Sequence, residues 1–456
     1  MSYLFSPHYK TLLFRKLWIA LAKAQHKLGL PIKKAQIAAL QKTAHQIDFD
    51  KVDEYEKKLR HDVMAHIHAF GDLCPIAKPI IHLGATSTFA TDNADLIQMK
   101  EALSLLHRKL IYVLRKLAAF TKKYARSPCL AFTHYQSAQP TTIGKRAALW
   151  LQDLFLDAQE WERLISHLPF LGAKGATGTQ SSFLSLFKGN AHKVQKLEEL
   201  IAKDFGFTTI LPIAGQTYSR KLDLNILNAF ESFAGSAHKL ATDLRLLAHD
   251  GEIAESFAKT QVGSSAMPYK KNPIYSERIC GIARFVISLS QNPAYTTATQ
   301  WLERTLDDSS NRRLAIPEAF LGVDAILNLL AHVLSSLTTS PQIALQRLKE
   351  ETPFLTMENI LMASVNKGGD RQALHEKLRQ ISLAARKKKD PLPFLLKEIE
   401  KNPDFKLKKQ EIKPLLSLAS LIGRAPEQAL DFLKKDVEPY LAKQKKQKAA
   451  ITPVDV

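Results

Sequence analysis

The chain has 456 residues, of which 45% are hydrophobic and 24% are charged, and its formal net charge is +20. This length and composition are typical of a folded protein with two or three domains, and they exclude a chain that is disordered throughout. Much of the positive charge falls in lysine runs at 386–389, 406–409 and 443–448. Because no aromatic or glycine-rich nucleic-acid motif stands beside these runs, we expect solvated helix faces there and no nucleic-acid partner.

The first residues and the cysteines indicate a cytoplasmic protein. No basic region followed by an apolar run opens the sequence, so no signal peptide is expected. Cys74, Cys129 and Cys280 lie far apart without a CxxC pair, which predicts reduced thiols and neither a disulfide nor a zinc site. The weakly charged stretch 325–346 contains polar residues and Pro341, so it predicts a buried helix followed by a turn and no membrane span.

Helical periodicity dominates the chain from end to end. Apolar residues recur at spacings of three and four within 95–124, 145–168, 222–247, 274–290 and 317–337, whereas alternating strand patterns are few and short. The pattern predicts an all-α protein whose long helices form an elongated bundle and bury further faces against other subunits. We expect three helical domains, at residues 1–86, 87–339 and 340–456, with the bundle in the second.

Polar or glycine-rich segments interrupt these helices, and the candidates for chemistry lie in them because loops at helix ends often carry function. The interruptions are at 82–93, 127–142, 172–182, 214–221, 251–273 and 301–313.

The segment 261–273 is the most specific of these interruptions. Its glycine, serines and prolines alone are typical of an inter-helix linker. However, Gly263 to Pro273 fill every fixed position of G-S-S-x-M-P-x-K-x-N-P. The segment therefore resembles the signature loop of the fumarase/aspartase superfamily, a class of all-α lyases built on a bundle of long helices.

Further segments resemble one family within that superfamily. The stretch 133–142, which contains His134, stands where the superfamily carries its proton-donating histidine. The segments 60–66, 82–87, 175–180, 215–221 and 303–313 are similar to those of the adenylosuccinate lyase family, and most closely to the animal-type enzymes. Argininosuccinate lyase, the nearest alternative, would share part of 133–142 but not 82–87 or 303–313 in these forms.

The resemblance implies a lyase that eliminates fumarate from a succinyl-amine. Such a reaction needs a base at the carbon next to a carboxylate and an acid at the departing nitrogen. By resemblance Ser264 is the base and His134 the acid, while Lys270 and Asn272 hold the carboxylate on which negative charge accumulates. Because a serine hydroxyl hardly ionises at neutral pH, we expect Lys270 and the backbone amides of the loop to stabilise the alkoxide. A retired lyase with a structural role would lack one of these groups.

The substrate implied by the resemblance is a nucleotide, yet the sequence contains no P-loop and no Rossmann glycine motif. Side chains must therefore hold its phosphate, and Arg304, Ser309 and Arg313 are the first candidates. Considered alone, the arginines would be interpreted as ion pairs with Asp307 or Asp308. The further substrate-binding candidates are Arg60, His61, Asp62, Thr86, Ser87, Gln216 and Arg278.

No metal and no cofactor are expected. His61, His66 and His68 stand at offsets of five and seven, which do not give the facing pair of rings that a spacing of four gives, and no Cys or Glu completes a set. The chemistry of the superfamily needs no metal either.

Two further expectations follow from the resemblance. Enzymes of this type carry an Arg-Tyr pair before the first helix, whereas the first arginine here is Arg15. We therefore expect a start further upstream, or weaker nucleotide binding by the chain as written. The superfamily also forms homotetramers whose active sites are shared, so His61, His134 and Ser264 would come from different subunits. The expected partners are adenylosuccinate, AMP, fumarate and other copies of the chain.

Overall fold

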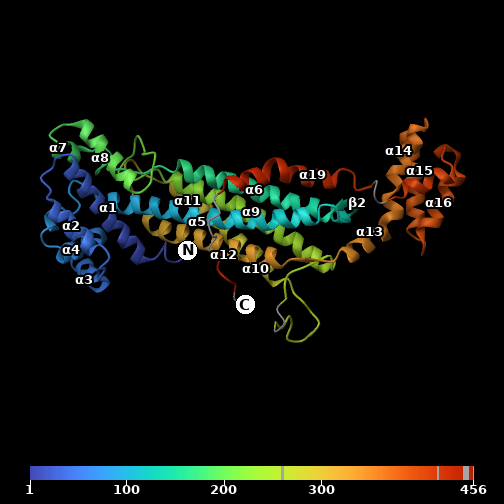
Figure 1. Ribbon diagram of the computed structural model, residues 1–456, viewed down its shortest axis with the longest axis horizontal. Coiled ribbons are helices and arrows are strands. Elements are labelled where there is room, and N and C mark those ends of the chain that lie inside the picture. Colours follow the sequence, from blue (N-terminus) through green and yellow to red (C-terminus); the bar gives the residue numbers. More distant parts are fainter. Residues whose placement is uncertain (258–260, 418–420, 445–450, 455–456) are drawn as a thin grey trace.

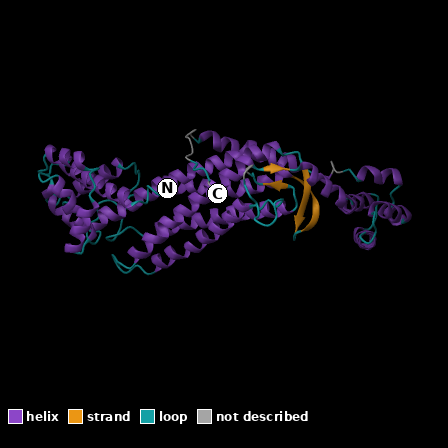
Figure 2. Cartoon of the chain, turned by 90° about the horizontal axis from the view of Figure 1, so that it is seen from below, coloured by secondary structure: helices purple, strands orange, loops and turns teal. Residues whose placement is uncertain are grey.

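The protein is an elongated rod of long helices with a smaller helical lobe at each end (Figure 1). The computed structural model describes residues 1–257, 261–417, 421–444 and 451–454. Strands within these ranges form two two-stranded sheets, β1 with β2 and β3 with β4, and they take up little of the chain (Figure 2). The predicted all-α class is confirmed.

The rod is a ring of five long helices. Their bounds are α5 (Ser87–Lys123), α6 (Ile143–His167), α9 (Lys221–His249), α10 (Ile274–Leu289) and α12 (Asp308–Ser336), and the short helix α11 (Gln291–Ala298) packs on α9 and α12. In this ring α5 contacts α6 and α12, α9 contacts α6 and α10, and α10 contacts α12. All five predicted apolar stripes lie within these helices to within a residue or two at their ends, because an apolar stripe at helical spacing must be covered by neighbours.

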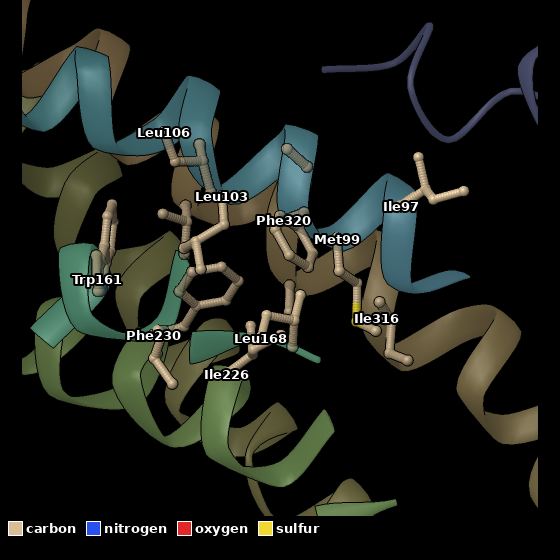
Figure 3. Close-up of a cluster of buried hydrophobic side chains, with 14 of the residues drawn as sticks. Ile97, Met99, Leu103, Leu106, Trp161, Leu168, Ile226, Phe230, Ile316 and Phe320 are labelled. Carbon is tan, nitrogen blue, oxygen red and sulfur yellow. The ribbon is translucent and has the colours of Figure 1, made fainter. Parts of the chain in front are cut away.

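Aromatic side chains fill the centre of the ring (Figure 3). Phe230 of α9 meets Phe320 of α12 edge to face at 4.7 Å between ring centroids, and Trp161 of α6 meets Phe230 at 5.5 Å. All three side chains are fully buried. Burying one such side chain contributes about 1.5–3 kcal/mol, so this cluster ties three helices together.

Helix α12 differs from the expectation at its beginning. The sequence predicts a helix over 317–337 and an interruption at 301–313, but the helix begins at Asp308. Its first turns are polar yet partly buried, because Asp308 and Arg312 have charged partners on other helices. Among the helices described, α12 alone has the length and mean hydropathy, 1.6, to cross a membrane. However, 67% of that window is buried inside the protein, as expected for a core helix.

The N-terminal lobe lies at one end of the rod. It comprises α1 (Pro7–Lys27), α2 (Lys34–Thr43), α3 (Phe49–Leu59), α4 (Asp62–Leu73) and the 3-10 turn η1 (Lys78–Ile80), and beside it lie α7 (Ser181–Leu186) and α8 (Ala191–Asp204). Helix α1 packs on both α5 and α8, so the core of this lobe is continuous with that of the rod.

The other end of the rod carries a hairpin and a separate lobe. The hairpin consists of β1 (Pro128–Thr133) and β2 (Gln136–Thr142), in a segment that the sequence predicts only as an interruption between helices, and α13 (Pro341–Leu355) packs against it. A small core of its own holds the lobe, whose elements are α14 (Met357–Asn366), α15 (Arg371–Ala385), α16 (Pro391–Lys401), η2 (Pro403–Phe405) and α17 (Lys409–Leu415).

The last helices return to the rod. Helix α19 (Ala425–Phe432), a π-helical turn η3 (Leu433–Val437) and α20 (Glu438–Lys443) lie along α6 and α5. Leu433, Val437 and Leu441 are buried in the main core and not in that of the lobe.

Candidate active site

A cavity of about 590 Å³ lies where the N-terminal lobe meets the rod. It is lined by α1, by the α3–α4 junction and by the beginnings of α5 and α12. Seven of the candidate substrate-binding residues line it, although they come from three distant parts of the sequence: Arg60, His61, Asp62, Ser87, Arg304, Ser309 and Arg313.

The junction between α3 and α4 presents three of these side chains in a row. Arg60 ends α3 in the left-handed conformation, at φ 52°, and its N–H donates to the carbonyl of Glu56. His61 is the N-cap of α4, where its Nδ1 accepts a hydrogen bond of 3.3 Å from the N–H of Met64. Asp62 is the first residue of α4 and lies 3.4 Å from Arg313 of α12. The sharp change of direction between the helices thus turns consecutive residues toward the cavity.

A buried network of charges lines the part of the cavity where α5, α9 and α12 begin. Arg220, at the start of α9, donates to Asp92 of α5 at 2.9 Å and to Asp308 of α12 at 2.6 Å, and all three side chains are at most 3% exposed. A buried charge is tolerated only when it is paired in this way. The network therefore fixes the beginnings of α5, α9 and α12 relative to one another.

A second guanidinium extends this network toward α1. Arg312 donates to Asp223 at 2.6 Å and lies 3.2 Å from Asp95, which also pairs with Lys10 of α1. Although burial alone would raise the pKa of Asp95, the positive charges of Lys10 and Arg312 hold it below its usual value. Arg312 also donates to the hydroxyl of Tyr218.

Arg220 and Arg312 are not among the residues predicted from the sequence, whereas the neighbouring Arg313 is. Two signals in the sequence were available. Asp92 and Asp95 are acidic residues three apart at the beginning of α5, and Arg312 follows Asp308 at a spacing of four. The ion pairs considered for the arginines have different partners, because Asp308 binds Arg220 and Arg313 binds Asp62.

His134 lies far from this cavity, in the hairpin at the opposite end of the rod (Figure 1). With Tyr135 it forms the two-residue turn between Thr133 and Gln136, and both turn residues have positive φ, 52° and 57°. Two left-handed residues define a type I′ turn, whose twist suits a hairpin but which usually requires asparagine or glycine. The histidine is exposed, so the strained turn presents its ring to the outside.

Ser264 lies in a third place, in a loop between β3 (Ile253–Ala254) and α10 that projects from the side of the rod (Figure 1). Its Oγ accepts hydrogen bonds from the N–H groups of Ala266, at 3.3 Å, and Met267, at 3.1 Å. The loop is folded back on itself, since Asn272 Nδ2 donates to the carbonyl of Gly263 at 3.0 Å. Lys270 is exposed.

The remaining three candidates do not line the cavity. Thr86 is the N-cap residue of α5, and its hydroxyl is hydrogen-bonded to that of Thr88. The N–H of Gln216 donates to the carbonyl of Glu303, so its segment is held against the one that carries Arg304. Arg278 is exposed in the first turns of α10. In the part of the chain that the structure describes, no group of three or more His, Cys, Asp or Glu side chains could hold a metal ion.

Comparison with known proteins relates this architecture to one class of enzyme. A family model described as "Lyase" matches residues 10–288, and one described as "Adenylosuccinate lyase C-terminus" matches residues 353–432. The crystal structure of fumarate lyase from Mesorhizobium sp. BNC1 has the same fold, with a TM-score of 0.82 at 22% identity over 95% of this chain and 97% of that one. The chain is therefore a member of the fumarase/aspartase superfamily of lyases.

Closer relatives place it within that superfamily. The adenylosuccinate lyase of Saccharomyces cerevisiae is 44% identical over 97% of this chain and 93% of the yeast protein. That of the animal Schistosoma mansoni is also 44% identical, over 96% and 92%. The chain belongs to the adenylosuccinate lyase family, which confirms the resemblance seen in its motifs.

Proposed function

We propose that the protein eliminates fumarate from adenylosuccinate to give AMP. We propose the same reaction for 5-aminoimidazole-4-(N-succinylcarboxamide) ribotide, which would give the carboxamide ribotide. The cavity between α4 and α12 carries this proposal, because Arg60, Arg304 and Arg313 line it together. A guanidinium offers a planar pair of donors to a phosphate, so the cavity suits a nucleotide without a glycine-rich loop.

In the proposed reaction Ser264 is the general base and His134 is the general acid. The serine takes the proton from the succinyl carbon beside a carboxylate, the C–N bond breaks, and the histidine protonates the departing nitrogen. The two N–H groups that donate to Ser264 Oγ support this role, since hydrogen bonds to the charged form of a group favour ionisation.

Lys270 and Asn272 would hold the carboxylate on which the charge accumulates. One N–H of the Asn272 amide is used by Gly263, and the second remains for the substrate because an amide nitrogen carries two donors. Donors that are already oriented lower the barrier most, since they need no rearrangement during the reaction.

The proposal includes a homotetramer in which active sites are shared between subunits. Within one chain the cavity, the turn with His134 and the loop with Ser264 lie in three separate places (Figure 1). Large apolar side chains also lie exposed on the rod helices α6, α9 and α10, among them Leu149, Leu156, Leu246 and Phe285. Such side chains support burial against further copies of the chain. The three buried, unpaired cysteines suit a reducing, cytoplasmic location.

Turnover of adenylosuccinate, followed by absorbance, tests the proposal, with argininosuccinate as the control substrate. We expect adenylosuccinate to be consumed and argininosuccinate to be left intact. Consumption of argininosuccinate alone would overturn the substrate, and the absence of turnover of either would overturn the activity.

A further inference from the structure

Both ends of the loop that carries Ser264 meet at a single carboxylate. Glu255 directly follows β3, where the loop begins. Its Oε1 accepts from the N–H of Ser276 at 2.7 Å and from the hydroxyl of the same residue, and its Oε2 accepts from the N–H of Tyr275 at 3.1 Å. Tyr275 and Ser276 lie in the first turn of α10, where the loop ends. Glu255 thus joins the beginning of the loop to its end.

The Glu255 carboxylate caps the N-terminus of α10. The first N–H groups of an α-helix have no partner within the helix and need one from outside. The N-cap residue of α10 is Pro273, which makes no side-chain capping bond. Glu255 supplies the acceptors from the opposite end of the loop, and its negative charge suits the positive end of the helix dipole.

A short series of contacts leads from Glu255 to the proposed base. Two residues after Glu255, the Phe257 ring lies against Gly263, where an added Cβ would stand only 3.0 Å from its Cζ. The same Cβ would be 1.9 Å from the carbonyl oxygen of Lys270, so the backbone at Gly263 is enclosed on both sides. The side-chain amide of Asn272 donates a hydrogen bond to the carbonyl of Gly263 at 3.0 Å. Gly263, the residue before Ser264, is therefore held between Phe257, on the outgoing limb that follows β3, and Lys270, on the returning limb that leads into α10.

We propose that Glu255 is a positioning residue for Ser264. It sets the separation of the two limbs and thereby the place of the Ser264 hydroxyl and of the amides that donate to it. The role rests on the proposed function, in which Ser264 is the base, and Glu255 itself touches no substrate. Glu255 is neither among the residues expected from the sequence nor among those that line the cavity.

The direct test compares Glu255→Gln with Ser276→Ala in the full-length protein. The glutamine keeps the size of the side chain but loses the charge and one acceptor, whereas Ser276→Ala removes only a hydroxyl donor and leaves both backbone donors in place. We expect kcat on adenylosuccinate to fall about 10- to 100-fold in Glu255→Gln, because a displacement of about 1 Å costs that much. It should change less than about 3-fold in Ser276→Ala.

The pH profile separates positioning from a purely structural effect. If Ser264 Oγ loses the orientation of its amide donors, its ionisation becomes harder, so the acidic limb of the kcat profile of Glu255→Gln should move to higher pH. KM should change less than kcat, because the cavity that would hold the phosphate lies elsewhere in the chain and Lys270 and Asn272, on the loop, would act on charge that accumulates during the reaction. A fall in kcat with an unchanged profile, or an unchanged kcat, would overturn the proposal.

Limited trypsin digestion tests, without any assay of activity, whether Glu255 holds the two ends of the loop together. Lys270 and Lys271 are exposed on the returning limb, so cleavage there should be at least about 5-fold faster in Glu255→Gln than in wild type or Ser276→Ala. Equal cleavage rates would show that Glu255 does not hold the loop. A wild-type protein inactive on adenylosuccinate would refute the proposed function, whereas the digestion would still decide whether Glu255 joins the limbs.

Discussion

Arg313 and Asp62 face each other across the mouth of the cavity, with 3.4 Å between the guanidinium and the carboxylate, although 251 residues separate them in the chain. Their side chains are 63% and 37% exposed. A pair as exposed as this contributes no more than about 1 kcal/mol to stability. A phosphate dianion can therefore displace Asp62 from the guanidinium at little cost, which makes Arg313 available to a substrate.

Replacing Arg313 by alanine should impair binding and leave the fold intact. We expect KM for adenylosuccinate to rise about 10- to 100-fold, since a charge-assisted hydrogen bond contributes about 1.5–3 kcal/mol. The free energy of unfolding should change by less than about 1 kcal/mol. Initial rates and urea denaturation measure the two effects. Arg379→Ala is the matched control, because Arg379 forms an exposed ion pair with Glu376 on α15, away from the cavity. An unchanged KM in Arg313→Ala would remove Arg313 from the phosphate site.

Arg220→Met, in contrast to Arg313→Ala, should destabilise the protein strongly. The substitution leaves Asp92 and Asp308 buried without their common partner. Removing one member of a buried ion pair costs about 3–5 kcal/mol. Urea denaturation should show this loss, with Arg313→Ala as the comparison. A loss below about 1 kcal/mol would mean that the network does not hold the beginnings of the three helices together.

Asp157 should make the protein less stable as the pH rises, the opposite of what a carboxylate in an ion pair does. Burial in α6 raises the pKa of its carboxyl to about 6, against about 4 in an unfolded chain, while the hydrogen bond that Ser232 donates to Oδ1 opposes the shift. The folded state thus retains the proton more tightly, so this group favours folding most below pH ~4. That contribution is lost as the pH rises from about 4 to about 6.

Asp157→Asn removes this dependence. We expect the variant to be more stable than wild type by about 1–3 kcal/mol at pH 8 and to differ little from it at pH 4, as measured by urea denaturation at both values. In wild type the Oδ2 atom of the carboxylate is buried and has no hydrogen-bond partner among the described residues. The substitution replaces the carboxylate by an uncharged amide group. A variant that loses the same stability at both pH values would contradict the predicted titration.

Mixing two inactive variants tests whether active sites are shared. His134→Ala and Ser264→Ala should each be inactive, but tetramers that contain both should recover activity, because some sites then combine an intact histidine with an intact serine. The measurement is adenylosuccinate turnover after the two proteins have been mixed under mild denaturant and the denaturant removed. His134→Ala mixed with itself is the control. No recovery, when mass spectrometry shows that subunits have exchanged, would argue against shared sites.

The sequence by itself determined the helix class, the apolar stripes of the rod and the residues of the signature loop. These are local properties, since a helical stripe and a fixed motif can be recognised without knowing what lies opposite them. It did not reveal the hairpin, because His134 and Tyr135 lack the asparagine or glycine that normally marks a type I′ turn.

Only the tertiary structure decided which charges pair. Arg220 and Arg312 look like ordinary polar residues in the sequence, yet Arg220 pairs with Asp92, 128 residues away, and Arg312 pairs with Asp95, which is further still along the chain. Likewise Arg313 is paired not with a neighbouring aspartate of its own helix but with Asp62 on α4. The physical reason is that the partner of a charge is set by the packing of α4, α5, α9 and α12 around it. That packing brings together residues that no local pattern relates.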